Sequence, residues 1–305
     1  MTSDARHLAG SKPAAACGRD FRHASRVTRH AAAFTLLELL VVIAILGILA
    51  ALGVPALKNL GKSNIQVSAT RQLLDDLGRA RQLALSQHTT VYMVFVPENF
   101  WLPPLTTSSA WTNALTPTEY NAAVDLLDKQ FSGYTFVSLR SVGDQPGQGV
   151  GRYISDWKSL PDGAFIATNK FNLYNFLNSS NSYYPIYDYS TATPVTYPIY
   201  SFNYTKSLPF PTATNTVNAN VWLPYVAFNY LGQLTVDGTS LAPRDEYIPL
   251  AQGGVAYAVD GNKALQFRQA DFTENPPGNS TNSMFNVIKV DNLTGRATLL
   301  QQKLQ

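Results

Sequence analysis

An apolar run over residues 34–57 sets the first limit on the architecture of this chain, because Glu38 is the only charged side chain in it. As a helix, these 24 residues would extend roughly 36 Å, at about 1.5 Å per residue. The hydrocarbon core of a bilayer is about 30 Å thick. The run therefore predicts a single transmembrane helix.

The charges on either side of the run predict its orientation. Residues 1–33 carry six basic side chains against Asp4 and Asp20, a net charge of +4, and the whole chain carries +3, so about −1 is left for residues 34–305. Cytoplasmic flanks of membrane helices are enriched in Lys and Arg, which places residues 1–33 in the cytoplasm and the C-terminal body outside it. The nearly neutral body has no basic field for nucleic acid, which is therefore not an expected partner.

The small residues of the chain that precede the run suggest a processing site. Signal peptidase I cuts after an apolar region, whereas Ala31, Ala32 and Ala33 come before this one. A cut on the cytoplasmic side, between Ala33 and Phe34, would instead leave Phe34 as the new N-terminus and Glu38 as the fifth residue. The leader would then be residues 1–33.

The segment FTLLELLVVIAILGILAALGVPAL resembles the N-terminal segment of type IV pilins and type II secretion pseudopilins. The resemblance implies that a prepilin peptidase removes the leader and methylates the amino group of Phe34. It also implies a role in assembly for Glu38 and for Pro55, the twenty-second residue of the mature chain. This leader ends in Ala33, where the family normally has Gly.

Glu38 needs a partner, because an acidic side chain at the centre of a membrane helix costs about 2.5 to 3.5 kcal/mol. The resemblance supplies the α-amino group of Phe34, in the same or a neighbouring subunit. The alternative is an interfacial residue that lies near the headgroups. Pro55 lacks an N–H and is expected to bend or loosen the helix, or else to end it.

Beyond the run, the sequence predicts an α+β, type IV pilin-like fold. Residues 58–88 continue the helix with an apolar face of Val67, Leu74, Leu77, Ala80 and Ala84, away from Arg71, Asp75, Arg79 and Gln82. Residues 89–305 form an extracytoplasmic body, with a Tyr-, Asn- and Pro-rich insertion at residues 169–220 that favours extended, loop-rich structure. Antiparallel strands are expected at residues 89–96, 134–139, 164–168, 221–230, 232–236, 264–268, 285–290 and 296–301.

A second resemblance is to the GspH/FimT minor pseudopilins. It rests on LLDDLGRARQLALSQHTTVYMVF in the helix and first strand, and on a final strand-turn-strand with Thr294, Gly295 and Arg296. Some FimT-type proteins bind DNA through a Gly-Arg-x-Arg pattern at this end, whereas this chain has Thr298 in place of the second Arg.

No constellation of side chains predicts catalysis. His88 is the one histidine outside the leader, no metal-ligand spacing occurs, and no cofactor is expected. The sequence therefore predicts a minor pseudopilin that primes or caps a pseudopilus in a type II secretion-like system, anchored in the bacterial inner membrane with its body in the periplasm. Its expected partners are the prepilin peptidase, other pilins or pseudopilins, and membrane lipid before assembly. A pilus-associated DNA receptor is the alternative, and a membrane-tethered hydrolase has no residues to support it.

Overall fold

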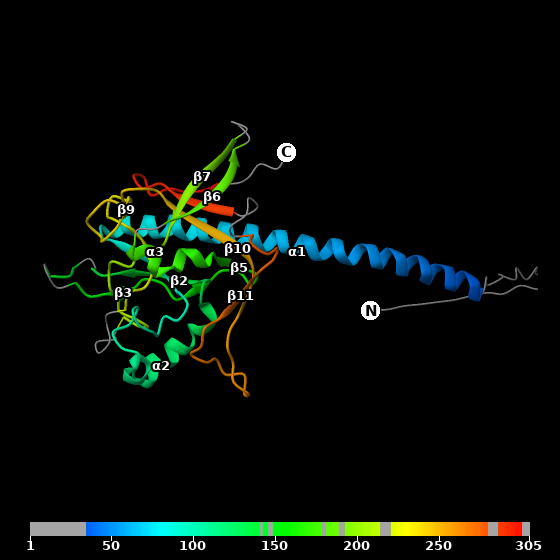
Figure 1. Cartoon of the computed structure of the whole chain (residues 1–305), viewed down its shortest axis with the longest axis horizontal. Coiled ribbons are helices and arrows are strands. Elements are labelled where there is room, and N and C mark those ends of the chain that lie inside the picture. Colours follow the sequence, from blue (N-terminus) through cyan, green and yellow to red (C-terminus); the bar gives the residue numbers. More distant parts are fainter. Residues whose placement is uncertain are drawn as a thin grey trace, which may run out of the picture. The chain divides into compact units, whose positions relative to one another are not determined.

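The computed structural model describes residues 35–140, 143–145, 149–178, 181–188, 193–213, 221–279 and 286–300, with side chains described outside 51–64 and 181–197. The chain divides into two compact units, Met1–Val54 and Pro55–Gln305. Helix α1 (Leu36–Gln87) contributes to both units and continues through Pro55, so this proline does not end the helix. Figure 1 shows the elements along the chain.

The second unit is built from antiparallel strands, as predicted for an α+β fold with a helix followed by sheets. One sheet has the order β3-β2-β1-β8-β9, with β4 also paired to β2, and another has the order β11-β10-β12-β13, with β5 also paired to β10. Strands β6 and β7 form a separate hairpin. The strands are β1 (Val91–Phe95), β2 (Gly133–Ser138), β3 (Arg152–Tyr153), β4 (Lys158–Ser159), β5 (Ala164–Ile166), β6 (Asn181–Asp188), β7 (Thr193–Tyr200), β8 (Tyr225–Phe228), β9 (Leu234–Thr235), β10 (Glu246–Ala256), β11 (Asp271–Glu274), β12 (Asn286–Val290) and β13 (Ala297–Leu300).

Both faces of the first sheet are covered, which explains why every residue of β1 is buried. Side chains of a strand alternate between its two faces. Val91, Met93 and Phe95 join the core under α1, while Tyr92 and Val94 join a second core. That second core includes Trp111 of η1 (Trp111–Ala114) and Ala123 of α2 (Pro117–Val124). In Figure 1, α2 and the cyan part of α1 lie on opposite sides of β2.

The C-terminal part of α1 packs on both sheets through a stripe of small and apolar side chains. Fully buried Leu73, Leu77, Ala80 and Ala84 share one core with Ile166 of β5, Leu250 of β10 and Ile288 of β12. The predicted face was displaced at its start, because Val67 is 41% exposed and Ala69 and Leu73 are buried instead. The polar residues Arg71, Asp75, Arg79 and Gln82 are exposed, as predicted.

A polar contact also fixes α1 to the first sheet. The carboxylate of buried Asp76 accepts a hydrogen bond from the Tyr134 hydroxyl at 2.6 Å and pairs with Lys158 Nζ at 2.6 Å. Burial and the bond to Asp76 raise the pKa of Tyr134 above its usual value. The register of the helix on the sheet is therefore specified by charge as well as by shape.

The longest strand, β10, was missed because its sequence holds Pro249 and a Gly-Gly pair. The Pro249 carbonyl accepts a bond from the Ala167 amide, just beyond the end of β5. The N–H and C=O of a strand residue point the same way, so the donor that proline lacks would face β5 and not β12. A Cβ on Gly253 would lie 1.9 Å from the Thr273 carbonyl oxygen, so β11 approaches closely only because this residue is glycine.

One further strand prediction has a different outcome. The strand expected at residues 264–268 is wrong, because only an isolated bridge between Val259 and Leu265 forms there.

Within the insertion at residues 169–220, the structure describes η3 (Thr168–Phe171), α3 (Leu173–Leu177) and the β6–β7 hairpin. Ile199 of β7 packs with Val287 of β12, which anchors the base of the hairpin. The short helix η2 (Leu127–Lys129) follows α2.

Candidate functional site

The predicted functional residues whose side chains the structure describes fall in two places, the N-terminal turn of α1 and the turn between β12 and β13. Ala33 and Phe34 lie outside the described residues, and so does the side chain of Pro55. The cleavage site and the role of Pro55 in assembly therefore stay predictions. Glu38, Thr294, Gly295 and Arg296 are described.

Glu38 caps the N-terminus of α1. Its Oε2 accepts bonds from the Thr35 backbone N–H at 2.8 Å and from the Thr35 hydroxyl at 2.9 Å, and the Glu38 N–H donates to Thr35 Oγ1 at 3.2 Å. This reciprocal pattern is a capping box, which satisfies backbone donors that the first turn of a helix leaves open. The signature Thr-x-x-Glu before an apolar run predicts it, and sequence reasoning overlooked Thr35.

The same device occurs a second time, at the start of α2. Thr116 and Glu119 exchange three corresponding hydrogen bonds, at 2.9, 2.8 and 3.4 Å. There the glutamate is buried, whereas the turn that holds Thr35 and Glu38 is exposed. Capping therefore accounts for Glu38 locally without excluding a second partner.

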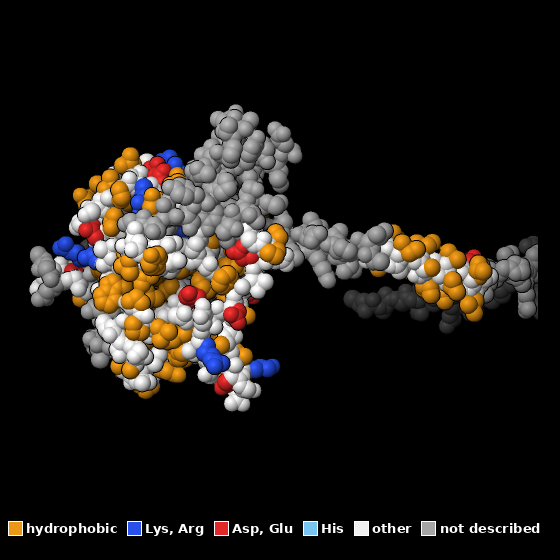
Figure 2. Space-filling view, viewed as in Figure 1, with side chains coloured by type: hydrophobic (Ala, Val, Ile, Leu, Met, Phe, Trp, Pro, Cys, Tyr) orange, Lys and Arg blue, Asp and Glu red, His pale blue; other side chains and the backbone are white. Residues whose placement is uncertain are grey.

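The described N-terminal part of α1 exposes large apolar side chains on every side. Leu36 is 81% exposed and Leu49 is 60% exposed, and nine further Leu, Ile and Val side chains between them are also exposed. Figure 2 shows hydrophobic side chains along the visible face of this part of the helix. An apolar surface of this extent requires a partner to cover it.

Within the described ranges, no helix combines the length and apolar character that are needed to cross a membrane.

The turn between β12 and β13 is a structural junction. Asp291 Oδ1 accepts bonds from the Thr294 N–H at 2.7 Å and from its hydroxyl at 2.8 Å. Arg81 Nε of α1 donates to the Thr294 carbonyl at 2.7 Å and to the Gly232 carbonyl, before β9, at 3.3 Å. The turn thus ties α1 to both sheets, through an arginine 213 residues away in sequence.

Gly295 and Arg296 differ in what they contribute to this junction. Gly295 has a φ of +62°, and a Cβ there would lie 2.0 Å from the Gly232 carbonyl oxygen. Only glycine fits such an approach. The Arg296 side chain is exposed, while its backbone carbonyl accepts a bond from the Asp291 N–H at 3.0 Å.

Metal binding receives no support from the residues that the structure describes, because they contain no cluster of three His, Cys, Asp or Glu side chains suited to hold an ion.

Residues 28–54 match the family model described as the prokaryotic N-terminal methylation motif, which is consistent with a prepilin-type cleavage and methylation protein. The motif indicates a type IV pilin-like or pseudopilin-type substrate of the prepilin peptidase, a class of structural subunits that assemble with other pilins. No curated protein and no solved structure matches the chain significantly.

Proposed function

We propose that this protein is a minor pseudopilin, which primes or caps a pseudopilus in a type II secretion-like system after removal of residues 1–33. The observation that carries the proposal is the methylation motif on the helix that also holds the antiparallel body. The resemblance to GspH/FimT proteins at Thr294, Gly295 and Arg296 supports the minor class.

The exposed apolar side chains of α1 support an anchor in the bacterial inner membrane. Lipid would cover them before assembly, and helices of other subunits would cover them in the filament. The basic leader favours a cytoplasmic N-terminus and a periplasmic body.

For Glu38 we propose two simultaneous partners. Both Thr35 bonds to the carboxylate end on Oε2, and among the residues described Oε1 accepts none. The amino group that cleavage would create on Phe34 can therefore pair with Oε1, from the same or a neighbouring subunit, while the cap stays in place.

A DNA receptor of FimT type is the second candidate. Exposed Arg296 favours it, since the arginine occupies the Gly-Arg position of that pattern. The absence of a second arginine and the net charge of about −1 over residues 34–305 weaken it, because nucleic-acid affinity depends on several phosphate contacts.

Mass spectrometry of the protein from cells that contain a prepilin peptidase tests the proposal. The mature chain should begin at Phe34 and carry one added methyl group, and Ala33→Gly should be processed at least as fast. An intact leader, or a start beyond Leu57, would contradict processing. Micromolar, salt-sensitive binding of DNA by the mature chain would favour the receptor instead.

A further inference from the structure

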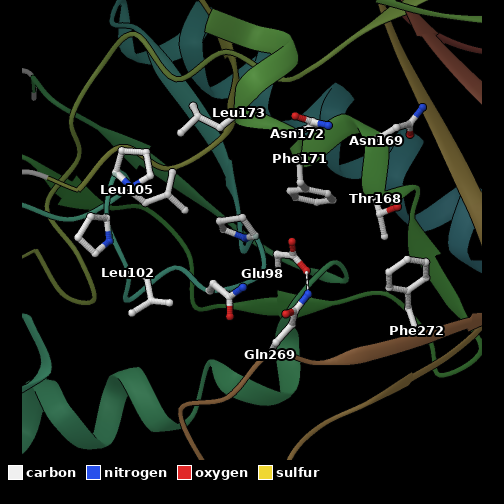
Figure 3. Close-up of a pocket in the computed structure, with 14 residues that line it drawn as sticks. Glu98, Leu102, Leu105, Thr168, Asn169, Phe171, Asn172, Leu173, Gln269 and Phe272 are labelled. Carbon is white, nitrogen blue, oxygen red and sulfur yellow. Dashed lines mark hydrogen bonds between the residues drawn. The ribbon is translucent and has the colours of Figure 1, made fainter. Parts of the chain in front are cut away.

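A cavity of about 620 Å³ lies in the body, distant in sequence from the methylation motif. Three segments line it: the residues after β1, the residues around η3 and α3, and Gln269 and Phe272 before and within β11. Its volume is within the range of pockets that hold small ligands. Figure 3 shows the side chains that line it.

The lining of the cavity is apolar, with amide groups and a single charge. Among the described residues that line it, Glu98 is the only charged side chain, and no Lys, Arg or His contributes. The apolar members are Pro97, Leu102, Pro103, Pro104, Leu105, Phe171, Leu173 and Phe272, the amides are Asn99, Asn169, Asn172 and Gln269, and Thr168 adds a hydroxyl.

Glu98 directs its charge into the cavity. Its Oε2 accepts a hydrogen bond from Gln269 Nε2 at 3.2 Å, and Figure 3 shows the two groups facing each other between the labelled walls. Across the described part of the chain, no Lys or Arg forms an ion pair with Glu98. A carboxylate in a partly apolar setting attracts a cation more strongly than one in open water.

The walls suit the stem of a long basic side chain. Phe272 and Leu102 remain 43% and 39% exposed. The Phe272 ring packs against the Phe131 ring at a centroid distance of 5.9 Å, which holds it in place. Lys and Arg bury their methylene stems on such surfaces, and aromatic faces attract their charged heads.

We propose that this cavity binds an extended peptide segment of a partner protein, with one Lys or Arg side chain directed at Glu98. The side-chain amide group of Asn99 and Gln269 Oε1, which have no other hydrogen bond among the described residues, would exchange hydrogen bonds with the peptide backbone. The leucine and proline walls would cover its apolar neighbours. Anionic ligands are disfavoured by the charge of Glu98. A neutral saccharide would match the amides, but it would leave the carboxylate without a counter-charge and the apolar walls without a complement.

The test uses the full-length mature protein in detergent micelles and an array of acetylated, amidated pentapeptides with a central Arg and varied apolar flanks. Each peptide has a twin in which citrulline, the neutral isostere, replaces Arg. The best Arg peptides should bind at least tenfold more tightly than their twins. Glu98→Gln should remove this difference and leave citrulline binding unchanged. Asp271 is an exposed carboxylate outside the cavity lining, so Asp271→Asn is the matched control. This variant should keep the difference in affinity between the Arg and citrulline peptides.

Several results would overturn the proposal: no Arg peptide that binds better than its twin, a preference that survives Glu98→Gln, or binding of maltotriose that Glu98→Gln leaves intact. Thermal unfolding of both variants checks that they fold like the wild type. Should Glu98→Gln not fold, the comparison of Arg with citrulline on the wild-type protein decides alone.

Discussion

Glu38 combines a local role with an intermolecular one, and substitutions can separate the two. Glutamine is accepted at the third position of a capping box, since its side-chain oxygen can also accept the Thr35 bonds. Glu38→Gln therefore keeps the cap and removes the charge. Thr35→Val has the opposite effect, because it keeps the charge and removes the two capping bonds that need the Thr35 hydroxyl.

Glu38→Gln should enter the membrane at least as well as the wild type, because a neutral amide is easier to bury than a charge. Leader removal should proceed, because the bond after Ala33 is untouched. Co-purification with other pilin-like subunits should be lost, because the amino group of Phe34 has no carboxylate to pair with. Unchanged co-purification would show that Glu38 is a tolerated interfacial residue. Membrane fractionation and pull-down, wild type against variant, measure these outcomes.

Thr35→Val should retain co-purification but weaken the first turn of α1 by about 1 kcal/mol, the usual contribution of an N-cap side chain. Amide hydrogen exchange of the first turn in micelles measures the loss. Thr35→Ser, which keeps the hydroxyl, is the matched control and should behave like the wild type. Loss of co-purification in Thr35→Val would show that assembly requires the cap itself.

Among the elements, the β12–β13 turn determines how the helix and the two sheets join. Gly295→Ala should lower the free energy of unfolding by at least about 2 kcal/mol, because it combines a left-handed φ with a 2.0 Å contact to the Gly232 carbonyl. Gly254→Ala, where no atom lies within 4 Å of the added carbon, is the control. Urea unfolding of the full chain followed by near-UV circular dichroism compares the two. Equal urea midpoints for the two variants would show that the close approach of Gly295 to Gly232 does not stabilise the fold.

The molecule as a whole depends on tyrosines buried in both of its cores. Burial raises the pKa of Tyr92 to about 12 and raises the pKa values of Tyr134, Tyr204 and Tyr225 further. In the unfolded chain, tyrosine titrates near pH 10. Above that pH the unfolded state binds fewer protons than the native state, so stability falls as pH rises.

We therefore expect the urea midpoint to decrease steadily from about pH 10.5 to pH 12. Lys170, whose pKa burial lowers, contributes with the opposite sign below the ordinary lysine pKa of about 10.4, so the decrease is measured above that value. Tyr204→Phe should make the decrease shallower by removing one titrating group. A urea midpoint that does not change up to pH 12 would show that burial does not raise the pKa values of these tyrosines.

Patterns within a few residues of one another were sufficient to predict a large part of this protein. The methylation motif, the helix after Pro55 and the strands near residues 91 and 287 all depend on local spacing. The Thr-x-x-Glu signature is equally local, although it was overlooked. Such patterns specify which face of an element is apolar, although Val67 shows that they place the edge of a face less well.

Those local patterns could not predict the contacts between segments that are distant in the sequence. Strand β10 forms despite Pro249 because the Ala167 carbonyl opposite it accepts a bond from the Lys170 N–H instead. Gly295 is required because Gly232 lies against it. The charge of Glu98 faces Gln269, 171 residues further along the chain. Local propensity contains no information about which segments meet, because that is determined by burial of apolar surface over the whole chain.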